Sequence, residues 1–422
     1  MKLKKYNNIN LAELEDNQVL FFVRIRGKKN VFNHYYPEEF LKSFSKLKMF
    51  RTISEYRVGD IHIDINLINI YDITNKQHIL FDKLLDIQDI IIRCRGLREI
   101  SYSESKSLIL RTAKFFDEYF LKHRNLKLIV SLIVDNYVMD VMVRMAKYYQ
   151  VEVIQLVGFF IPGYVRFTDK GIGIKVRDVK GTEVLSVINR LELKKESHFA
   201  TGKLKSIKRA IIDYISYKYR YIIRYLLKYK VLGRLEYEYR FAKYFKGFNK
   251  ISKLSVNKYY DSFTKIKKTS VFIPLHYHPE ATVDYWSDKP ENADYLGSLL
   301  PVISFYREMG VQVVFKEHPA YYLRRSIEFY KVLKAYDNVI IIEPFSSSQS
   351  IVELVDKVCI HTGSVGLESL MLDKHVYKIT ENYYSFGFIP KYDQLHKPYK
   401  LLSKKEKIYI IKRILETTLP TN

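Results

Sequence analysis

Short apolar runs alternate strictly with helix-like segments through residues 269–379, and this alternation constrains the fold more than any other feature. The runs lie at 269–275, 311–316, 338–343, 357–361 and 375–379 and are rich in Val, Ile and Phe. Strands that are joined by helical crossovers pair in parallel. This part of the chain therefore predicts an open, doubly wound sheet of five strands.

The first half of the chain repeats this pattern less regularly. Apolar runs at 19–25, 61–71 and 89–94 have strand character, and a helical segment follows at 105–121. The stretch 126–159 then has the pattern of strand, helix and strand, which is a βαβ unit. We therefore predict an α/β protein with two Rossmann-type domains.

A basic stretch separates the two halves. Residues 201–270 contain 19 Lys and Arg residues against four acidic residues, and also 11 tyrosines. Ile and Leu residues within it recur at helical spacing with basic residues between them. These basic residues are Lys218, Arg220, Arg224 and Lys228. We predict a helical basic linker region, which either packs between the domains or docks residues 203–230 on an anionic membrane surface.

These patterns divide the chain into four parts. The expected parts are an N-terminal α/β domain at 1–195, a basic, Tyr-rich helical region at 196–268, a C-terminal Rossmann-like domain at 269–400 and a C-terminal helix at 401–422.

Composition excludes several classes of protein. A hydrophobic content of 47% excludes a disordered chain, and no apolar run approaches the roughly 18 residues of a membrane span. The N-terminus has no apolar signal-peptide core, and the two cysteines, Cys94 and Cys359, are too few for a disulfide framework and lack metal-type spacing. We expect a cytoplasmic protein, peripheral on the inner face of the membrane if the basic helices bind lipid. The net charge of +24 favours an anionic partner: nucleotide phosphates, an acidic glycan, anionic lipid or nucleic acid.

Polar or glycine-rich residues follow four of the five C-terminal strands. In open α/β sheets, ligands bind outside the carboxyl ends of the strands. The four strand ends read HYHPEAT at 276–282, EHP at 317–319, EPFSSSQS at 343–350 and HTGSVGLE at 361–368. Their clustering favours a binding site at this edge of the sheet.

The HTGSVGLE segment is the candidate phosphate site. A strand ends, glycines allow close backbone approach and a helix begins, so N–H groups face a ligand. Thr362 and Ser364 add hydroxyl donors, and Glu368 can accept from a ribose hydroxyl. An ordinary helix cap would have the same pattern. The expected nucleotide and phosphate ligands are Lys316, His318, Pro319, Thr362, Gly363, Ser364, Val365, Gly366 and Glu368.

Two residues are the candidate catalytic groups. His318 can donate to a phosphate or a leaving group, and Glu280 can act as a nucleophile or a general base. Each could equally be structural, His318 as a strand-end histidine and Glu280 as a solvated loop residue. His276 and His278 are spaced as a metal pair would be but lack a convincing third ligand, so we expect no metal and assign both to the cleft.

The N-terminal half offers candidates for an acceptor site. Asp135 and Asp140 follow the apolar run 126–134, and Arg166 lies in a Gly-rich segment where we expect an exposed loop. These residues either bind an acceptor or serve as helix-capping acids and a solvated loop.

The motifs FIPLHYHPEAT, VFKEHP and HTGSVGLESLMLDKHVYKI, in this order, resemble the bacterial capsule polysaccharide biosynthesis family, which includes the β-Kdo transferases. The resemblance covers residues 270–390. It implies a GT-B fold, with an N-terminal acceptor domain and a C-terminal domain that binds a CMP-activated 2-keto sugar acid such as CMP-Kdo. No further cofactor is implied.

The resemblance also implies roles for individual residues. Glu280 matches an acidic nucleophile of retaining relatives, and His318 with Pro319 matches a motif that holds the nucleotide phosphate. Ser364 matches a serine-glycine turn, and Glu368 matches the acid that follows it. His278 replaces the family's Gln.

The function predicted from the sequence is therefore transfer of a sugar such as Kdo to a glycan or glycolipid of a surface polysaccharide, with retention. The first alternative is a polyol-phosphate transferase of teichoic-acid type with a CDP donor, although TGSVG replaces that group's turn. The second is a non-catalytic basic protein that binds nucleic acid or a membrane surface. No nucleic-acid motif is present, so we expect no nucleic-acid partner.

Overall fold

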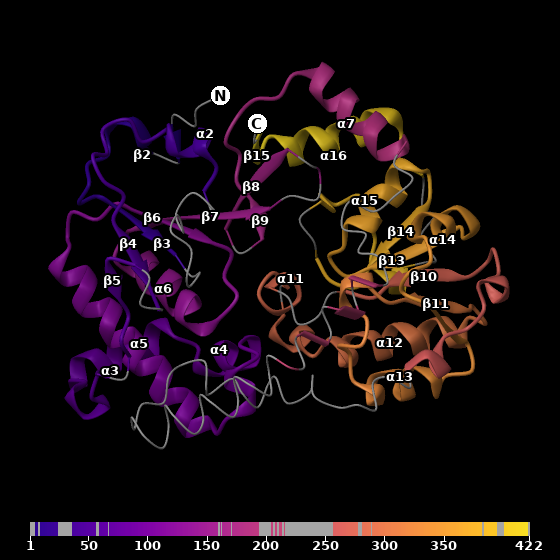
Figure 1. Ribbon diagram of the computed structural model, residues 1–422, viewed down its shortest axis with the longest axis horizontal. Coiled ribbons are helices and arrows are strands. Elements are labelled where there is room, and N and C mark those ends of the chain that lie inside the picture. Colours follow the sequence, from indigo (N-terminus) through magenta and orange to yellow (C-terminus); the bar gives the residue numbers. More distant parts are fainter. Residues whose placement is uncertain are drawn as a thin grey trace. The chain divides into compact units, whose positions relative to one another are not determined.

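The structure is a computed structural model, and its described residues form two compact units, Met1–Val179 with Arg413–Asn422, and Lys180–Lys412 (Figure 1). The described residues are 5–6, 9–23, 36–55, 59–65, 67–158, 161, 163–169, 171–193, 256–276, 281–287, 289–381, 384–394 and 401–420, with single residues between 204 and 215. Most of the predicted basic helical region, including Lys218, Arg220, Arg224 and Lys228, lies outside them.

The sheet of the C-terminal unit has five parallel strands in the order β12-β11-β10-β13-β14. The strands are β10 (Val271–Pro274), β11 (Val313–Lys316), β12 (Val339–Ile342), β13 (Lys357–Ile360) and β14 (His375–Lys378). The chain adds strands outward from β10 on one side and then crosses over to add β13 and β14 on the other. The predicted doubly wound sheet is confirmed, and its topological switch point lies between β10 and β13.

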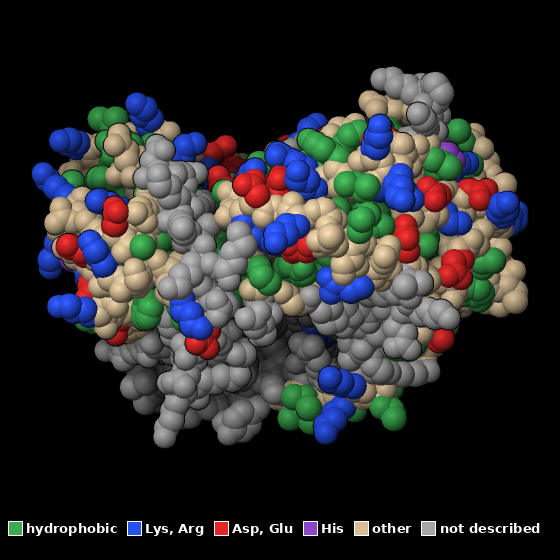
Figure 2. Space-filling model, turned by 90° about the horizontal axis from the view of Figure 1, so that it is seen from above, with side chains coloured by type: hydrophobic (Ala, Val, Ile, Leu, Met, Phe, Trp, Pro, Cys, Tyr) green, Lys and Arg blue, Asp and Glu red, His purple; other side chains and the backbone are tan. Residues whose placement is uncertain are grey.

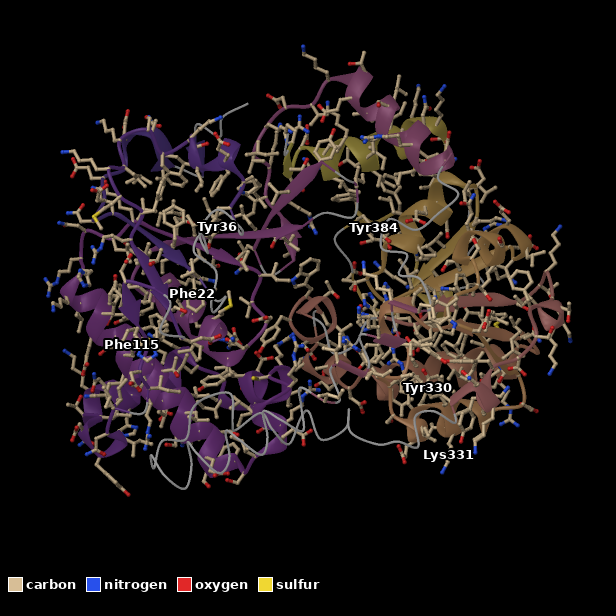
Figure 3. All side chains as sticks on the ribbon, viewed as in Figure 1. Phe22, Tyr36, Phe115, Tyr330, Lys331 and Tyr384 are labelled. Carbon is tan, nitrogen blue, oxygen red and sulfur yellow. The ribbon has the colours of Figure 1, made fainter. Side chains whose placement is uncertain are left out.

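Buried residues on alternate positions of these strands form one core with the helices. Val271, Ile273, Val313 and Phe315 pack with Tyr295, Leu299, Tyr330 and Leu333, among others. The helices of this unit are α7 (Gly181–Leu193), α11 (Ala281–Asp284), α12 (Tyr295–Glu308), α13 (Ile327–Lys334), α14 (Ser348–Leu354) and α15 (Ser364–Met371), and α16 (Lys404–Leu415) follows them. Helix α13 has one apolar side, since Tyr330 is buried whereas Lys331 points outward (Figure 3).

The N-terminal unit has a second Rossmann-like sheet. Its parallel strands lie in the order β7-β6-β3-β4-β5, which is the same topological order as in the C-terminal unit. They are β3 (Val19–Phe22), β4 (Thr52–Ser54), β5 (Ile61–His62), β6 (Leu128–Leu132) and β7 (Glu152–Gly158). The predicted α/β fold class with two Rossmann-type domains is therefore confirmed.

Antiparallel strands extend this sheet beyond β7. They are β8 (Tyr164–Asp169), β9 (Ile172–Gly173) and β15 (Thr418–Pro420), and β15 pairs with β8 although it follows α16 in the chain. A separate two-stranded sheet joins β1 (Lys5–Tyr6) to β2 (Ile9–Asn10). The last residues of the chain thus complete the N-terminal sheet, which the sequence pattern does not predict.

Four of the five described helices of the N-terminal unit begin at polar caps, and the exception, α2, follows Pro37. Ser101 and Glu104 form a capping box on α5, and Asn136 caps α6 by accepting a hydrogen bond from the Met139 N–H. The helices are α2 (Glu38–Leu41), α3 (Asn75–Leu84), α4 (Ile87–Arg93), α5 (Tyr102–Lys122) and α6 (Tyr137–Tyr148). Inside the core, the Tyr36 hydroxyl donates to the Phe22 carbonyl (Figure 3).

Two predicted strands of this half were wrong. The run 89–94 is part of helix α4, because the Asp86 side chain caps it and Asp89 pairs with Arg93 at a spacing of four residues. In the run 61–71 only Ile61–His62 is a strand, and Leu67 is 81% exposed, so the alternation of buried residues does not continue. Short apolar runs fit a strand or a buried helix equally well.

The prediction of an exposed loop around Arg166 was also wrong. Arg166 lies in strand β8, is 2% exposed, and donates from Nη2 to the Gly171 carbonyl at 2.7 Å. Two antiparallel neighbours, β7 and β15, enclose this strand and bury the residue.

On the face drawn in Figure 2, lysine and arginine side chains are interspersed with acidic ones. No helix among the described residues is long and apolar enough to cross a membrane.

Candidate functional site at the C-terminal switch point

The loops that follow β10 and β13 meet at the switch point of the C-terminal sheet. His276 follows β10, and His361 and Thr362 follow β13. His276 Nε2 lies 2.8 Å from Thr362 Oγ1, and the rings of His276 and His361 have centroids 6.0 Å apart. Residues 86 positions apart in the chain thus come together at the place where α/β sheets bind ligands.

The predicted phosphate turn has the geometry of an uncapped helix start. Gly363 is the N-cap residue of α15, where no side chain caps the helix. The Tyr384 hydroxyl donates to the Gly363 carbonyl at 2.5 Å and so fixes the turn. The half-buried Ser364 begins the helix. The N–H groups of the first helical turn can bind an anion when no side chain caps them.

Gly366 has a packing role in this turn. It is buried, and a Cβ atom there would collide with Ile360 and the Tyr384 hydroxyl. A glycine at this position therefore lets α15 lie close to β13 and lets Tyr384 reach the Gly363 carbonyl.

We expect Gly366→Ala to lower the free energy of unfolding of the C-terminal unit by about 1–3 kcal/mol, because Ile360 and Tyr384 must move. Urea unfolding followed by the fluorescence of Trp286, the only tryptophan, measures this change. Gly181→Ala is the matched control, since an added Cβ at this helical glycine of the same unit meets no atom within 4 Å. Equal stability of the two variants would contradict the packing role.

The end of β11 adds a buried charged cluster. Glu317 is 0% exposed and accepts from the His318 N–H at 2.8 Å. Arg325 donates to Glu317 at 2.5 Å from Nε and at 3.0 Å from Nη2. Arg325 Nη2 also donates to the His276 carbonyl at 2.6 Å. The ends of β10 and β11 are thus joined through Glu317 and Arg325.

Lys316 lies beside this cluster and is 5% exposed. Burial disfavours the charged form and lowers the pKa of the ammonium group to about 8, although the negative charges of Glu317 and Glu343 act to raise it. Its Nζ lies 3.5 Å from the Glu317 carbonyl oxygen. An amine with this pKa changes its charge near neutral pH.

The structure lines up the four predicted strand ends along one edge of the sheet, in the order β12, β11, β10 and β13. Those of β10, β11 and β13 are adjacent, whereas β12 is the outer strand of the sheet. The exposed Glu343 and the serines that follow it therefore lie two strands away from the switch point. His278 and Glu280 lie outside the described residues.

The other predicted ligands surround the same edge. Pro319 begins a short 3-10 helix (Pro319–Tyr321) directly after His318. Val365 and the half-buried Glu368 lie in α15. Among the described residues, no three His, Cys, Asp or Glu side chains are grouped as a metal ion would require.

A hollow of about 1010 Å³ opens at the carboxyl end of β14, in the same unit. Its walls are the end of β14, the start of α12, the segment 387–394 and the beginning of α16. Lys378, Lys391, Glu381 and Glu406 line it, so both signs of charge are present. None of the described switch-point residues His276, His318, Thr362 and Ser364 lines it.

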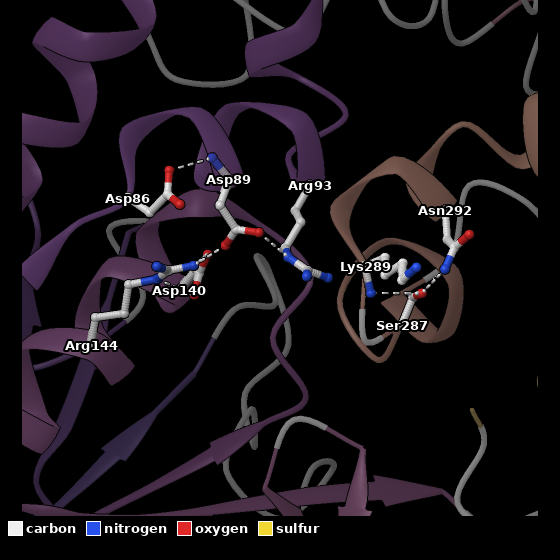
Figure 4. Close-up of polar contacts among 8 residues, drawn as sticks. All are labelled: Asp86, Asp89, Arg93, Asp140, Arg144, Ser287, Lys289 and Asn292. Carbon is white, nitrogen blue, oxygen red and sulfur yellow. Dashed lines mark hydrogen bonds and ion pairs between the residues drawn. The ribbon is translucent and has the colours of Figure 1, made fainter. Parts of the chain in front are cut away.

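The predicted acceptor residues have partners of their own in the N-terminal unit. Asp140 is 1% exposed and accepts from Arg144 Nε at 3.0 Å. Arg144 also binds Asp89, which accepts from Arg93 (Figure 4). Burial opposes ionisation of Asp89, but the hydrogen bonds from Arg93 and Arg144 outweigh it and hold the pKa of Asp89 below its ordinary value. Asp140 is therefore a member of a buried ion-pair network.

Asp135 is half-buried at the end of β6, and its carbonyl oxygen lies 3.5 Å from Arg95 Nη2. Next to it, Asn136 donates to both carboxylate oxygens of the buried Glu55, at 3.1 and 3.2 Å. Arg166 belongs to β8 and is buried, as described above.

Sequence reasoning missed several residues of these sites. The side chains of Tyr295 and Arg325 bind backbone groups of His276, and the Tyr384 side chain binds the Gly363 carbonyl. In the N-terminal unit, Glu55 binds Asn136. A carboxylate directly after an apolar strand was the available signal for the buried role of Glu317, whereas Glu55 follows the short and largely polar strand β4. Nothing in the local sequence indicates the other three.

No protein-family model and no curated protein matches this chain. Among solved structures, the β-Kdo 2,7 transferase KpsC of Thermosulfurimonas dismutans is 14% identical, with 73% of this chain and 82% of that chain covered and a TM-score of 0.34. The UDP-GlcNAc 2-epimerase of Methanocaldococcus jannaschii is 12% identical over 95% of this chain and 93% of that chain, with a TM-score of 0.24. The wall teichoic acid polymerase TagF is 11% identical over 98% and 85%, with a TM-score of 0.22. The chain is thus distantly similar to Kdo transferases and to nucleotide-sugar epimerases.

Proposed function

We propose that this protein is a glycosyltransferase that moves a 2-keto sugar acid such as Kdo from a CMP-activated donor to a glycan or glycolipid acceptor. The observation that supports it most is the junction at the switch point, where His276 contacts Thr362 beside the uncapped start of α15. The motifs of residues 270–390 point to the same class of donor.

The phosphate of CMP binds at the start of α15 in this proposal. Ser364 and the first-turn N–H groups donate to it, and His318 donates from the end of β11, which β10 separates from β13. One phosphate carries less charge than a diphosphate, so these donors can stabilise the leaving group without a metal ion.

The reaction proceeds with retention through Glu280 in this proposal. The Glu280 carboxylate attacks the anomeric carbon as the bond to the phosphate oxygen of CMP breaks. An acceptor hydroxyl then displaces Glu280 and loses its proton to water, which gives the glycoside and restores the free carboxylate. CMP leaves with the electron pair of the broken bond.

We expect wild-type protein to bind CMP in the presence of EDTA, and Ser364→Ala and His318→Ala each to weaken this binding by about 1–3 kcal/mol, because each removes a hydrogen bond to a charged group. Isothermal titration with CMP, CDP and UDP side by side measures these affinities. Ser350→Ala is a control, since Ser350 lies in α14, which follows the outer strand β12. Unchanged CMP affinity in both site variants would refute the site.

The same titration decides between classes of function. A clear preference for CDP favours a polyol-phosphate transferase, and a preference for UDP favours a different nucleotide-sugar enzyme. Turnover of CMP-Kdo with release of CMP is the direct test of the proposed donor. Binding of none of the three nucleotides would refute the proposed function.

A further inference from the structure

The main chain of His276 is held by two side chains of the C-terminal unit. Its N–H donates to the Tyr295 hydroxyl at 2.8 Å, and its carbonyl accepts from Arg325 Nη2 at 2.6 Å. Its ring is held as well, because Nε2 lies 2.8 Å from Thr362 Oγ1. The position of the His276 backbone therefore decides whether the ring reaches the phosphate turn.

Glu317 holds the main chain of His318, the other candidate histidine. Its Oε1 accepts from the His318 N–H, and its Oε2 accepts from the Tyr330 hydroxyl, both at 2.8 Å. Arg325 bonds to both carboxylate oxygens of Glu317. One buried ion pair thus connects the backbones of His276 and His318.

The packing of Arg325 keeps its guanidinium in one orientation. Its Cζ lies 4.5 Å from the ring centroid of Phe329 and 4.8 Å from that of Tyr321. Arg325 is 6% exposed and Glu317 is 0% exposed. A buried ion pair is weak evidence for stability, because well-packed apolar residues of similar volume often serve as well. Apolar residues cannot make directional bonds to a backbone N–H and a carbonyl, which is what this pair does.

We propose that Tyr295, Arg325 and Glu317 are positioning residues for the reaction, which hold the backbones of His276 and His318 at the edge of the sheet where the phosphate turn lies. The inference rests on the proposed function. Tyr295 and Arg325 act through His276 on Thr362, and Glu317 acts through His318. Burial also raises the pKa of Tyr295 to about 12, which keeps its hydroxyl protonated.

Tyr295→Phe tests the inference with little change in volume. We expect CMP affinity to fall about fivefold to tenfold, as the loss of one hydrogen bond predicts. Tyr306→Phe is the matched control, because Tyr306 lies on the same helix, is fully buried in the same core and bonds to none of the switch-point residues. We expect the two variants to have similar melting temperatures, and only Tyr295→Phe to bind CMP more weakly.

A double variant separates positioning of the His276 ring from a general loss of structure. If Tyr295 acts through the His276 ring, Tyr295→Phe adds no further loss of CMP affinity to a His276→Ala protein. A full additional loss in the double variant would overturn the inference. Arg325→Lys keeps a positive charge beside Glu317 but lacks the fork that also reaches the His276 carbonyl. The part of its effect that acts through His276 should disappear in a His276→Ala protein, and the part that acts through Glu317 and His318 should remain.

Hydrogen exchange at the His276 amide gives a readout that needs no ligand. Tyr295→Phe removes the acceptor of this N–H, so we expect at least tenfold faster exchange at His276 and no change in Tyr306→Phe. An unchanged rate would overturn the inference whether or not the protein binds CMP. Failure of wild-type protein to bind CMP, CDP and UDP would instead refute the proposed function, and the exchange result would still report on His276.

Discussion

Glu280→Gln is expected to lower kcat with CMP-Kdo by two or more orders of magnitude and to leave CMP affinity within about threefold. The amide keeps the shape of the side chain but cannot attack the anomeric carbon or take up a proton, and loss of a nucleophile or base commonly has an effect of this size. Single-turnover kinetics and a CMP titration measure the two quantities separately.

Glu308→Gln is the control for this experiment. Glu308 is an exposed glutamate at the end of α12, so its substitution changes the net charge by the same amount without affecting the switch point. Near-normal kcat in Glu280→Gln would remove Glu280 from the mechanism. Trapping of a covalent glycosyl-enzyme on Glu280 would support retention, and an inverted product would assign the residue to a base role instead.

The sequence predicted the architecture well where the hydrophobic period of a segment and its length indicate the same type of secondary structure. The five strands of the C-terminal sheet alternate with long amphipathic segments, and each strand was found within a few residues of its predicted place. In the N-terminal half the short runs were ambiguous, and the Asp86 cap and the Asp89–Arg93 pair made a helix of residues 87–93. The strand Thr418–Pro420 pairs with β8, more than 240 residues earlier in the chain, and no local pattern could indicate that partner.

The same limit applies to the site. Knowledge that ligands bind at carboxyl ends of strands was enough to select the loops at His276, His318 and Thr362. It could not select Arg325, because a charged residue before a helix usually faces solvent, and only the folded chain places it against the His276 carbonyl. Side chains that recognise ligands follow strand ends directly, whereas the residues that support them come from any element packed nearby.

Removal of Glu317 with Arg325 left in place should cause the largest loss of stability in the C-terminal unit. We expect Glu317→Ala to cost about 3–5 kcal/mol, because it leaves a buried guanidinium without its carboxylate. Urea unfolding followed by Trp286, which lies in this unit, reports the change. Lys391→Ala is a control, since Lys391 pairs with Asp393 at the surface, where such a pair contributes little.

The double variant Glu317→Leu/Arg325→Met separates stability from positioning. Two apolar side chains of suitable volume remove both buried charges, so most of the stability lost in Glu317→Ala should return. CMP affinity should not return with it, because neither new side chain can bond the His276 carbonyl or the His318 N–H. A double variant that regains both stability and wild-type CMP affinity would show that the pair supports the core alone. Recovery of stability without affinity would mean that the ion pair is needed for the placement of the two histidines.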